Sequence, residues 1–115
     1  MSTSARIIWL GLGILPYAGI ATFDAWIHEN NRKVPVLERA IHYCAALTLL
    51  GFLAGVFLAR SALALAFLVP FLALVTWDEL GFHRGIARNE RRVHMIAYAA
   101  LFMFIAVWCW VDART

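Results

Sequence analysis

The strongest constraint in this sequence is a set of four stretches that contain no Asp, Glu, Lys, Arg or His. Each stretch is 17 residues long, and they cover residues 7–23, 43–59, 61–77 and 95–111. Seventeen residues of α-helix rise about 26 Å, close to the roughly 30 Å thickness of the hydrocarbon core of a bilayer. The stretches lack the period-2 alternation of strands, and only helices or closed barrels satisfy the backbone in lipid. We therefore predict an all-α integral membrane protein with four transmembrane helices.

The composition agrees with this prediction. Of the 115 residues, 63% are hydrophobic and 15% are charged, against roughly 45–50% and 25% in soluble domains. A chain this short has too little interior to hide so much apolar surface from water. We expect the lipid bilayer as its main partner, and we expect no nucleic-acid partner, because the net charge of +3 is explained by the loops of a membrane protein.

An internal repeat divides the chain in two. Shifts of 54 and 52 residues superpose polar residues, and the matched pairs are Arg6 with Arg60, Asp24 with Asp78, Glu38 with Glu90, and His42 with His94. We predict two duplicated transmembrane hairpins, repeat 1 at 5–59 and repeat 2 at 60–112, which form one four-helix bundle domain over 1–115. A very tight turn around residues 60–61 joins the middle two helices. Because each repeat holds an even number of spans, a pseudo-twofold axis along the membrane normal relates the hairpins in parallel.

The basic residues predict the orientation. Seven of the ten Lys and Arg residues lie in the two segments 24–42 and 78–94, which this topology places on one side of the membrane. The positive-inside rule makes that side cytoplasmic and places both termini outside. We expect the plasma or inner membrane.

Every histidine lies on this same side and has an acid four residues before it. The pairs are Asp24 with His28, Glu38 with His42, Glu79 with His83, and Glu90 with His94. Residues four apart share one helix face, so each helix end presents a carboxylate and an imidazole together. Oxygen and nitrogen donors from four helices predict a site for two divalent metal ions with open coordination positions.

The third helix is irregular. The repeat aligns Asp78 with Asp24, whereas the four-residue spacing to His83 selects Glu79. We predict that Asp78, Glu79 or both bind metal, and that an acid of this pair that does not bind lies beside the site. The extra residue before His83 predicts a π-bulge.

The ligand pattern resembles that of ferritin-like di-iron and di-manganese proteins and of haemerythrins, which build metal sites in four-helix bundles. It differs from the ferritin-like pattern in its spacing of four rather than three and in its four histidines. The resemblance implies a di-metal centre, with iron favoured and zinc or manganese as alternatives. It does not imply a particular reaction.

Several functions fit these residues. The first is a di-metal oxidoreductase acting on dioxygen, peroxide, a quinone or a lipid. One alternative is a non-enzymatic protein for metal sensing, storage or delivery. Another is a zinc-dependent membrane hydrolase. Each pair taken alone is also explained by an ordinary contact within a helix, and facing histidines by haem ligation. Whether the protein is an enzyme, and whether it has a protein partner or forms a homo-oligomer, stays open.

Two tyrosines lie on the same helix faces as predicted ligands, nearer the middle of their helices. Tyr98 follows His94 by four residues, and Tyr17 precedes Asp24 by seven. Filling of the bundle, a hydrogen bond to a ligand and redox chemistry are all open roles for them.

Overall fold

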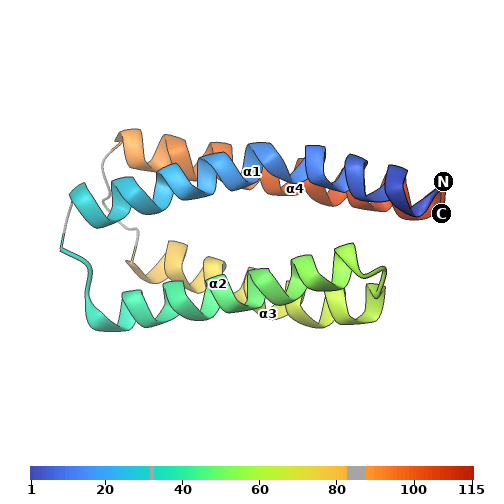
Figure 1. Ribbon diagram of the computed structural model, residues 1–115. Helices are drawn as coiled ribbons and strands as arrows, with labels where there is room; N and C mark the ends of the chain where they lie inside the picture. Colours follow the sequence, from blue (N-terminus) through green and yellow to red (C-terminus); the bar gives the residue numbers. More distant parts are fainter. Residues whose placement is uncertain (32, 83–87) are drawn as a thin grey trace. The chain divides into compact units, whose positions relative to one another are not determined.

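The computed structural model describes residues 1–31, 33–82 and 88–115, and it describes side chains over 1–27, 33–81 and 90–115. In these ranges the chain forms four α-helices: α1 (Thr3–Asn31), α2 (Val36–Phe57), α3 (Ser61–Phe82) and α4 (Arg88–Ala113) (Figure 1). All four helices are long and apolar enough to cross a membrane. The prediction of an all-α chain with four helices of spanning length is therefore confirmed.

Each helix extends beyond the uncharged stretch that predicted it. The apolar spans are 21 to 25 residues long, which corresponds to about 32–38 Å of helix. They are therefore longer than the roughly 30 Å hydrocarbon core. As a consequence, the acids and histidines next to the uncharged stretches, such as Asp24, His42, Asp78 and His94, belong to the helices, whereas Arg60 lies in the turn between α2 and α3.

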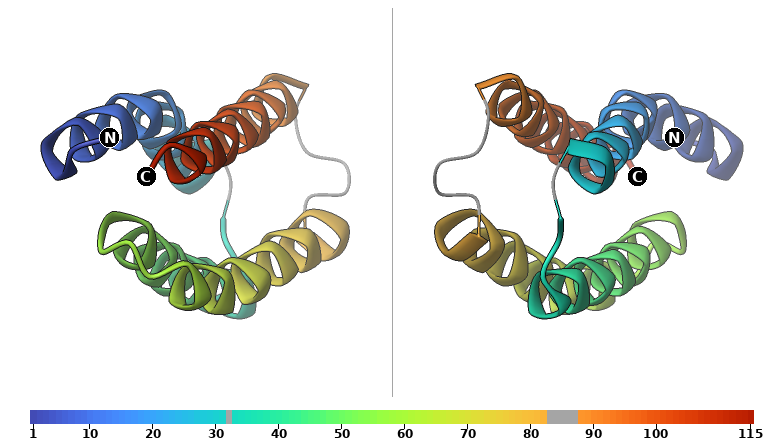
Figure 2. Two further views of the ribbon diagram at one scale, coloured as in Figure 1. Left: turned by 90° about the vertical axis from the view of Figure 1, so that its right-hand side faces the viewer. Right: turned by 90° about the vertical axis from the view of Figure 1, so that its left-hand side faces the viewer.

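The helices pack in two antiparallel pairs. One compact unit comprises residues 1–32 and 87–115, in which α1 packs against α4, and the other comprises 33–86, in which α2 packs against α3 (Figures 1 and 2). The two predicted repeats and the two packed units therefore divide the chain differently. Under the repeat, α1 corresponds to α3 and α4 corresponds to α2. The packed α1/α4 pair therefore corresponds to the packed α2/α3 pair.

The α2/α3 pair is closed at one end by a tight turn, as predicted. Helix α2 ends with a left-handed residue, Ala59 (φ 57°), and the Arg60 amide donates to the Gly55 carbonyl at 2.8 Å. This is the Schellman arrangement, which satisfies the last carbonyls of a helix. The turn brings the helices very close together, because a Cβ atom on Gly55 would lie 2.4 Å from the Ala64 backbone nitrogen.

In the α1/α4 pair, side chains hold the equivalent ends together. Arg6, only 4% exposed, forms an ion pair with Asp112 near the other end of the chain. The Trp9 and Trp110 rings meet edge to face with centroids 5.4 Å apart, and the Arg114 guanidinium lies 4.4 Å from the Trp110 centroid. Aromatic and cation–π contacts of this kind add to the ion pair.

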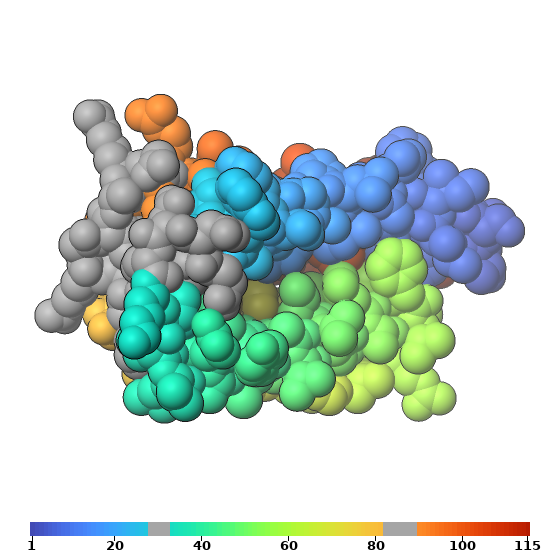
Figure 3. All heavy atoms as spheres, turned by 60° about the vertical axis from the view of Figure 1, so that its left-hand side comes forward, coloured from blue at the N-terminus to red at the C-terminus, as the bar shows by residue number. Residues whose placement is uncertain are grey.

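Large apolar side chains cover the outside of both pairs. Phe104 and Phe52 are fully buried between their helices, whereas Leu15 on α1 and Leu47 on α2 are more than half exposed. Figure 3 shows the outer surface of the chain along α1 and α2. An apolar surface of this extent is unusual for a protein in water and is compatible with contact to lipid.

Candidate functional site

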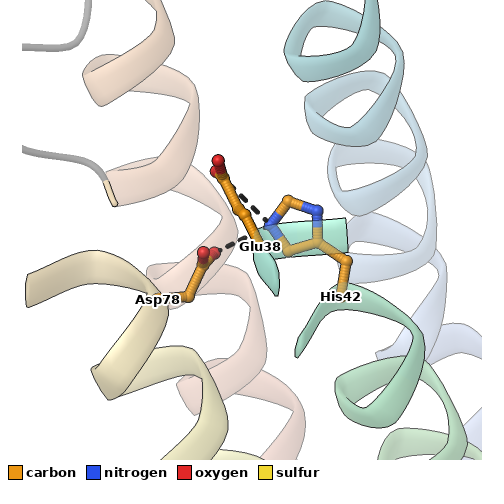
Figure 4. A group of neighbouring side chains, drawn as sticks. All are labelled: Glu38, His42 and Asp78. Carbon is orange, nitrogen blue, oxygen red and sulfur yellow. Dashed lines mark hydrogen bonds and ion pairs between the residues drawn. The ribbon is translucent and has the colours of Figure 1, made fainter. Parts of the chain in front are cut away.

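Three side chains of the α2/α3 pair meet at the end opposite the tight turn. The Nε2 atom of His42 lies 3.0 Å from Oδ2 of Asp78 and 3.8 Å from Oε1 of Glu38 (Figure 4). One donor atom from each residue lies within 4.8 Å of the other two. Glu38, fully buried, and Asp78, 8% exposed, are enclosed by the protein.

The two helices bring these residues together through simple local rules. Pro35 precedes α2 in an extended conformation, and its carbonyl accepts the first helical hydrogen bond from Arg39. Glu38 and His42 then lie four residues apart on one face of α2. Since α3 runs antiparallel to α2, its end brings Asp78 to the same place.

The helix dipoles affect the two carboxylates differently. Glu38 lies in the first turn of α2, where the positive end of the dipole stabilises a carboxylate. Asp78 lies in the last turns of α3, near the negative end of the dipole, which disfavours a negative charge. The position of Asp78 therefore favours a positive partner, either a protonated His42 or a metal ion.

One of the two donor-atom distances equals the separation of two ligands of one metal ion, and the other is longer. Ligand atoms about 2.1 Å from an ion lie about 3.0 Å apart in adjacent octahedral positions and about 3.4 Å apart in a tetrahedron. The distances from His42 to Asp78 and to Glu38 are 3.0 and 3.8 Å. The shorter distance is also that of an ordinary hydrogen bond, so the group accommodates either a shared proton or an ion.

The α1/α4 pair carries the same residue types at the equivalent end. Nδ1 of His94 lies 2.6 Å from Oδ1 and 2.7 Å from Oδ2 of Asp24. Glu90 lies four residues before His94 on α4 and is only 1% exposed. Among the side chains that the structure describes, only Glu38, His42 and Asp78 bring three such donors within 4.8 Å.

Most of the predicted ligands whose side chains the structure describes belong to one of these two groups. Asp78 belongs to the group around His42, whereas Glu79 is half-buried and outside that group. Helix α3 is α-helical from Ser61 to Phe82, whereas the π-bulge predicted before His83 extends into residues outside the described part of the chain. The side chain of His28, and His83 altogether, lie outside the described residues.

The spacing rule missed the contacts between helices. It predicted pairs within one helix, but His42 lies closer to Asp78 on α3 than to Glu38 on its own helix, and His94 contacts Asp24 on α1. The repeat held part of the missing signal, because it matches Asp24 with Asp78 and not with Glu79.

A tyrosine adjoins the α1/α4 group. The ring of Tyr98 lies one helical turn beyond His94, with the two ring centroids 6.5 Å apart. Tyr17 is buried in the same helix pair, at 8% exposure. Both tyrosines lie on the side of the group that faces the middle of the helices.

No protein-family model, curated protein or solved structure matches the chain. The donors are carboxylate oxygens and imidazole nitrogens, a set that suits iron, manganese and zinc.

Proposed function

We propose that this protein is a membrane-embedded di-metal protein, with iron as the metal, that carries out redox or oxygen chemistry at the cytoplasmic membrane interface. The observation that carries the proposal is the group formed by Glu38, His42 and Asp78, whose oxygen and nitrogen donors lie within 4.8 Å of one another. The contact between His94 and Asp24 repeats its carboxylate–imidazole chemistry in the other helix pair.

Each helix pair would hold one ion. In the α2/α3 pair the ligands would be Glu38, His42 and Asp78. In the α1/α4 pair the equivalent residues are Asp24, Glu90 and His94. His28 and His83, which the sequence places on the same side of the membrane, are assigned as one further ligand for each ion. Two carboxylates and two imidazoles leave about two of the six positions of an octahedral ion open.

Iron is preferred here because of the resemblance to di-iron carboxylate bundles, since the ligand set itself also suits zinc and manganese. A shell of carboxylate and imidazole ligands with open positions suits a metal that changes its oxidation state and binds dioxygen or peroxide. The protein residues would hold and orient the ion, and the apolar helices would limit the access of water. A quinone or a lipid would approach from the bilayer.

The division of ligands between helices supports the same proposal. In ferritin-like sites two helices each bring a Glu, and the other two each bring a Glu and a His three residues apart. Here α2 and α4 each bring a Glu and a His four apart, while Asp24 and Asp78 come from α1 and α3; the further ligands His28 and His83 have no counterpart in ferritin-like sites. The resemblance concerns the ligand types and their distribution.

The orientation in the membrane follows from the charges. The seven basic residues of segments 24–42 and 78–94 would lie in the cytoplasm, with four spans and both termini outside. The carboxylates and histidines belong to these same segments, so the metal ions would lie at the cytoplasmic edge of the bilayer. Charged groups are costly deeper in the membrane unless they are paired.

The test is the metal content of the protein purified in mild detergent, combined with Mössbauer spectroscopy. We expect two iron ions per chain, and we expect His42→Ala and His94→Ala each to lose one of them. Tyr43→Phe is the control, because Tyr43 adjoins His42 in sequence but is 66% exposed and provides no predicted ligand.

Other results would contradict the proposal. If the wild-type protein bound no metal, or if both histidine variants kept full occupancy, the proposal would be wrong. Zinc as the sole metal would support a hydrolase or a non-enzymatic metal-binding protein instead.

A further inference from the structure

The two helix pairs carry the same residue types at equivalent places but hold them differently. Each pair has one Glu, one His and one Asp that the repeat matches, and these are Glu38, His42 and Asp78 in α2/α3 and Glu90, His94 and Asp24 in α1/α4. The first three bring one donor atom each within 4.8 Å of the others. Among the side chains that the structure describes, the second three do not form such a group. The α2/α3 group therefore needs less rearrangement to bind an ion.

The closest contact in each pair shows the same difference. Nε2 of His42 lies 3.0 Å from Oδ2 of Asp78, which is about the separation of two adjacent ligands of an octahedral ion with bonds of about 2.1 Å. An ion can replace the hydrogen in this contact while both side chains keep their places. Nδ1 of His94 lies 2.6 and 2.7 Å from the two carboxylate oxygens of Asp24. These atoms are closer together than two such ligands, so this contact must open before an ion can enter.

The third donor is in place in the α2/α3 group but not, among the described side chains, in the α1/α4 pair. Glu38 is fully buried, and its Oε1 atom lies 3.8 Å from Nε2 of His42. Glu90 is likewise buried, at 1% exposure, but it does not complete a group of three with Asp24 and His94. To reach an ion there, its side chain would have to move within a packed helix pair, which close packing resists.

These rearrangements raise the metal concentration at which the α1/α4 pair fills. When only a fraction of the protein is competent to bind, the apparent Kd rises by the inverse of that fraction. Minor conformations of folded proteins are typically populated at about 0.1–10%. An ion that must open the contact between Asp24 and His94 is therefore expected to bind about tenfold or more weakly than an ion that enters the preformed group. The proposed function assigns one further histidine to each ion, so the number of ligands does not distinguish the two.

We infer that the two ions bind in a fixed order. The first occupies the group of Glu38, His42 and Asp78, and the second enters the α1/α4 pair only at a metal concentration about tenfold or more higher. This inference rests on the proposed function and concerns the regulation of that site. At low metal supply the protein holds one ion, and the two-metal form appears only when metal is more abundant. The supply of metal thereby controls the amount of the two-metal form.

The test is a titration of the full-length, metal-free protein in detergent with Mn(II), which suits the same donors as iron. Electron paramagnetic resonance measures the free Mn(II) at each point. We expect two binding steps in the wild type, with dissociation constants that differ about tenfold or more. Asp78→Asn and Asp24→Asn are a matched pair, because the repeat aligns these residues. The first should remove the tight step, and the second should remove the weak step and leave the tight one unchanged.

Further variants control for folding and for detergent effects. Glu38→Gln changes a second ligand of the same group and should weaken the tight step even if Asp78→Asn does not fold. Tyr43→Phe should keep both steps, because Tyr43 is 66% exposed and provides no predicted ligand.

The possible failures are distinguishable. Two steps of equal affinity in the wild type, or loss of the tight step in Asp24→Asn instead of Asp78→Asn, would overturn the inference and leave the proposed function intact. Wild-type protein that binds no metal, or never more than one ion per chain, would overturn the proposed two-metal function, and the inference with it.

Discussion

Asp24 and His94 are 70 residues apart in the chain, yet Oδ1 of one lies 2.6 Å from Nδ1 of the other. The matching contact in the other helix pair joins Asp78 and His42, which are 36 residues apart, at 3.0 Å through Nε2. Each contact fastens the end of one helix to the start of another. These carboxylate–imidazole contacts therefore contribute to helix pairing as well as to the candidate metal sites.

The adjacent acids Asp78 and Glu79 provide a matched pair of substitutions. We predict that Asp78→Asn reduces the bound metal by one ion per chain, because the amide is a much weaker ligand than the carboxylate. Glu79→Gln removes the same charge one residue away, outside the group around His42, and should leave the metal content unchanged. Elemental analysis of both variants, purified in parallel, measures the difference. Equal loss in both variants would show that charge, not ligation, controls metal binding.

Metal should stabilise the folded protein. A ligand that binds only the folded state at 100 times its Kd adds about 2.7 kcal/mol to the free energy of unfolding. We predict that Fe(II) or Mn(II) raises the thermal midpoint in detergent and that chelation with EDTA reverses the shift. Glu38→Gln preserves the shape of a fully buried side chain but removes a ligand, so its metal-dependent shift should be smaller. A shift as large as that of the wild type would exclude Glu38 as a ligand.

Gly55 is predicted to be essential for the close packing of α2 and α3. A Cβ atom there would lie 2.4 Å from the backbone nitrogen of Ala64, so Gly55→Ala must push the helices apart. We expect a loss of about 1–3 kcal/mol, as for other overpacked sites. The control is Gly11→Ala, because nothing lies within 4 Å of its added Cβ, and alanine there should be neutral or stabilise α1 by up to about 1 kcal/mol. Thermal unfolding in detergent compares the two, and equal midpoints would contradict the close approach.

The ion pair between Arg6 and Asp112 should matter more than a surface pair. Asp112→Leu leaves the buried Arg6 guanidinium without this carboxylate, at an expected cost of about 2 kcal/mol. This value is below the roughly 3–5 kcal/mol of fully buried pairs, because the Asp112 side chain is 31% exposed. The double variant Arg6→Met/Asp112→Leu should recover most of the loss.

A further variant controls for the general effect of losing an arginine. Arg60, which the repeat matches with Arg6, is exposed, and Arg60→Met should leave the unfolding midpoint unchanged. A double variant no more stable than Asp112→Leu alone would show that the buried charge is not the source of the loss.

The helices could be predicted from the sequence, but their partners could not. Charge-free stretches of equal length predicted four helices because few other structures satisfy a backbone in lipid. The face by which each helix packs against its partner is harder to predict. Lipid is as apolar as a protein core, so residues that face lipid and residues that face the partner helix are both apolar. Phe104 is fully buried and Phe102, two residues away, is 60% exposed, although hydropathy cannot distinguish them.

The candidate site was predicted in its residue types and only partly in its contacts. The four-residue spacing identified Glu38 and His42 on one face of α2, because that spacing reflects helix geometry. The contact of His42 with Asp78 depends on which helices pack together and in which register. The repeat alignment favoured Asp78, while the spacing favoured Glu79, and the spacing rule does not apply between two helices.

The side chains that close the α1/α4 pair also bear on how the protein is made. Helix α2 and its partner α3 are separated by three residues and can pair as soon as both have been synthesised. Helix α1 is synthesised before the other three helices and its partner α4 after them, and contacts of such long sequence separation form slowly. During synthesis, Arg6 can therefore pair with Asp112, and Asp24 with His94, only after α4 has been made. Incompletely packed intermediates of this kind are the species that misassemble in general.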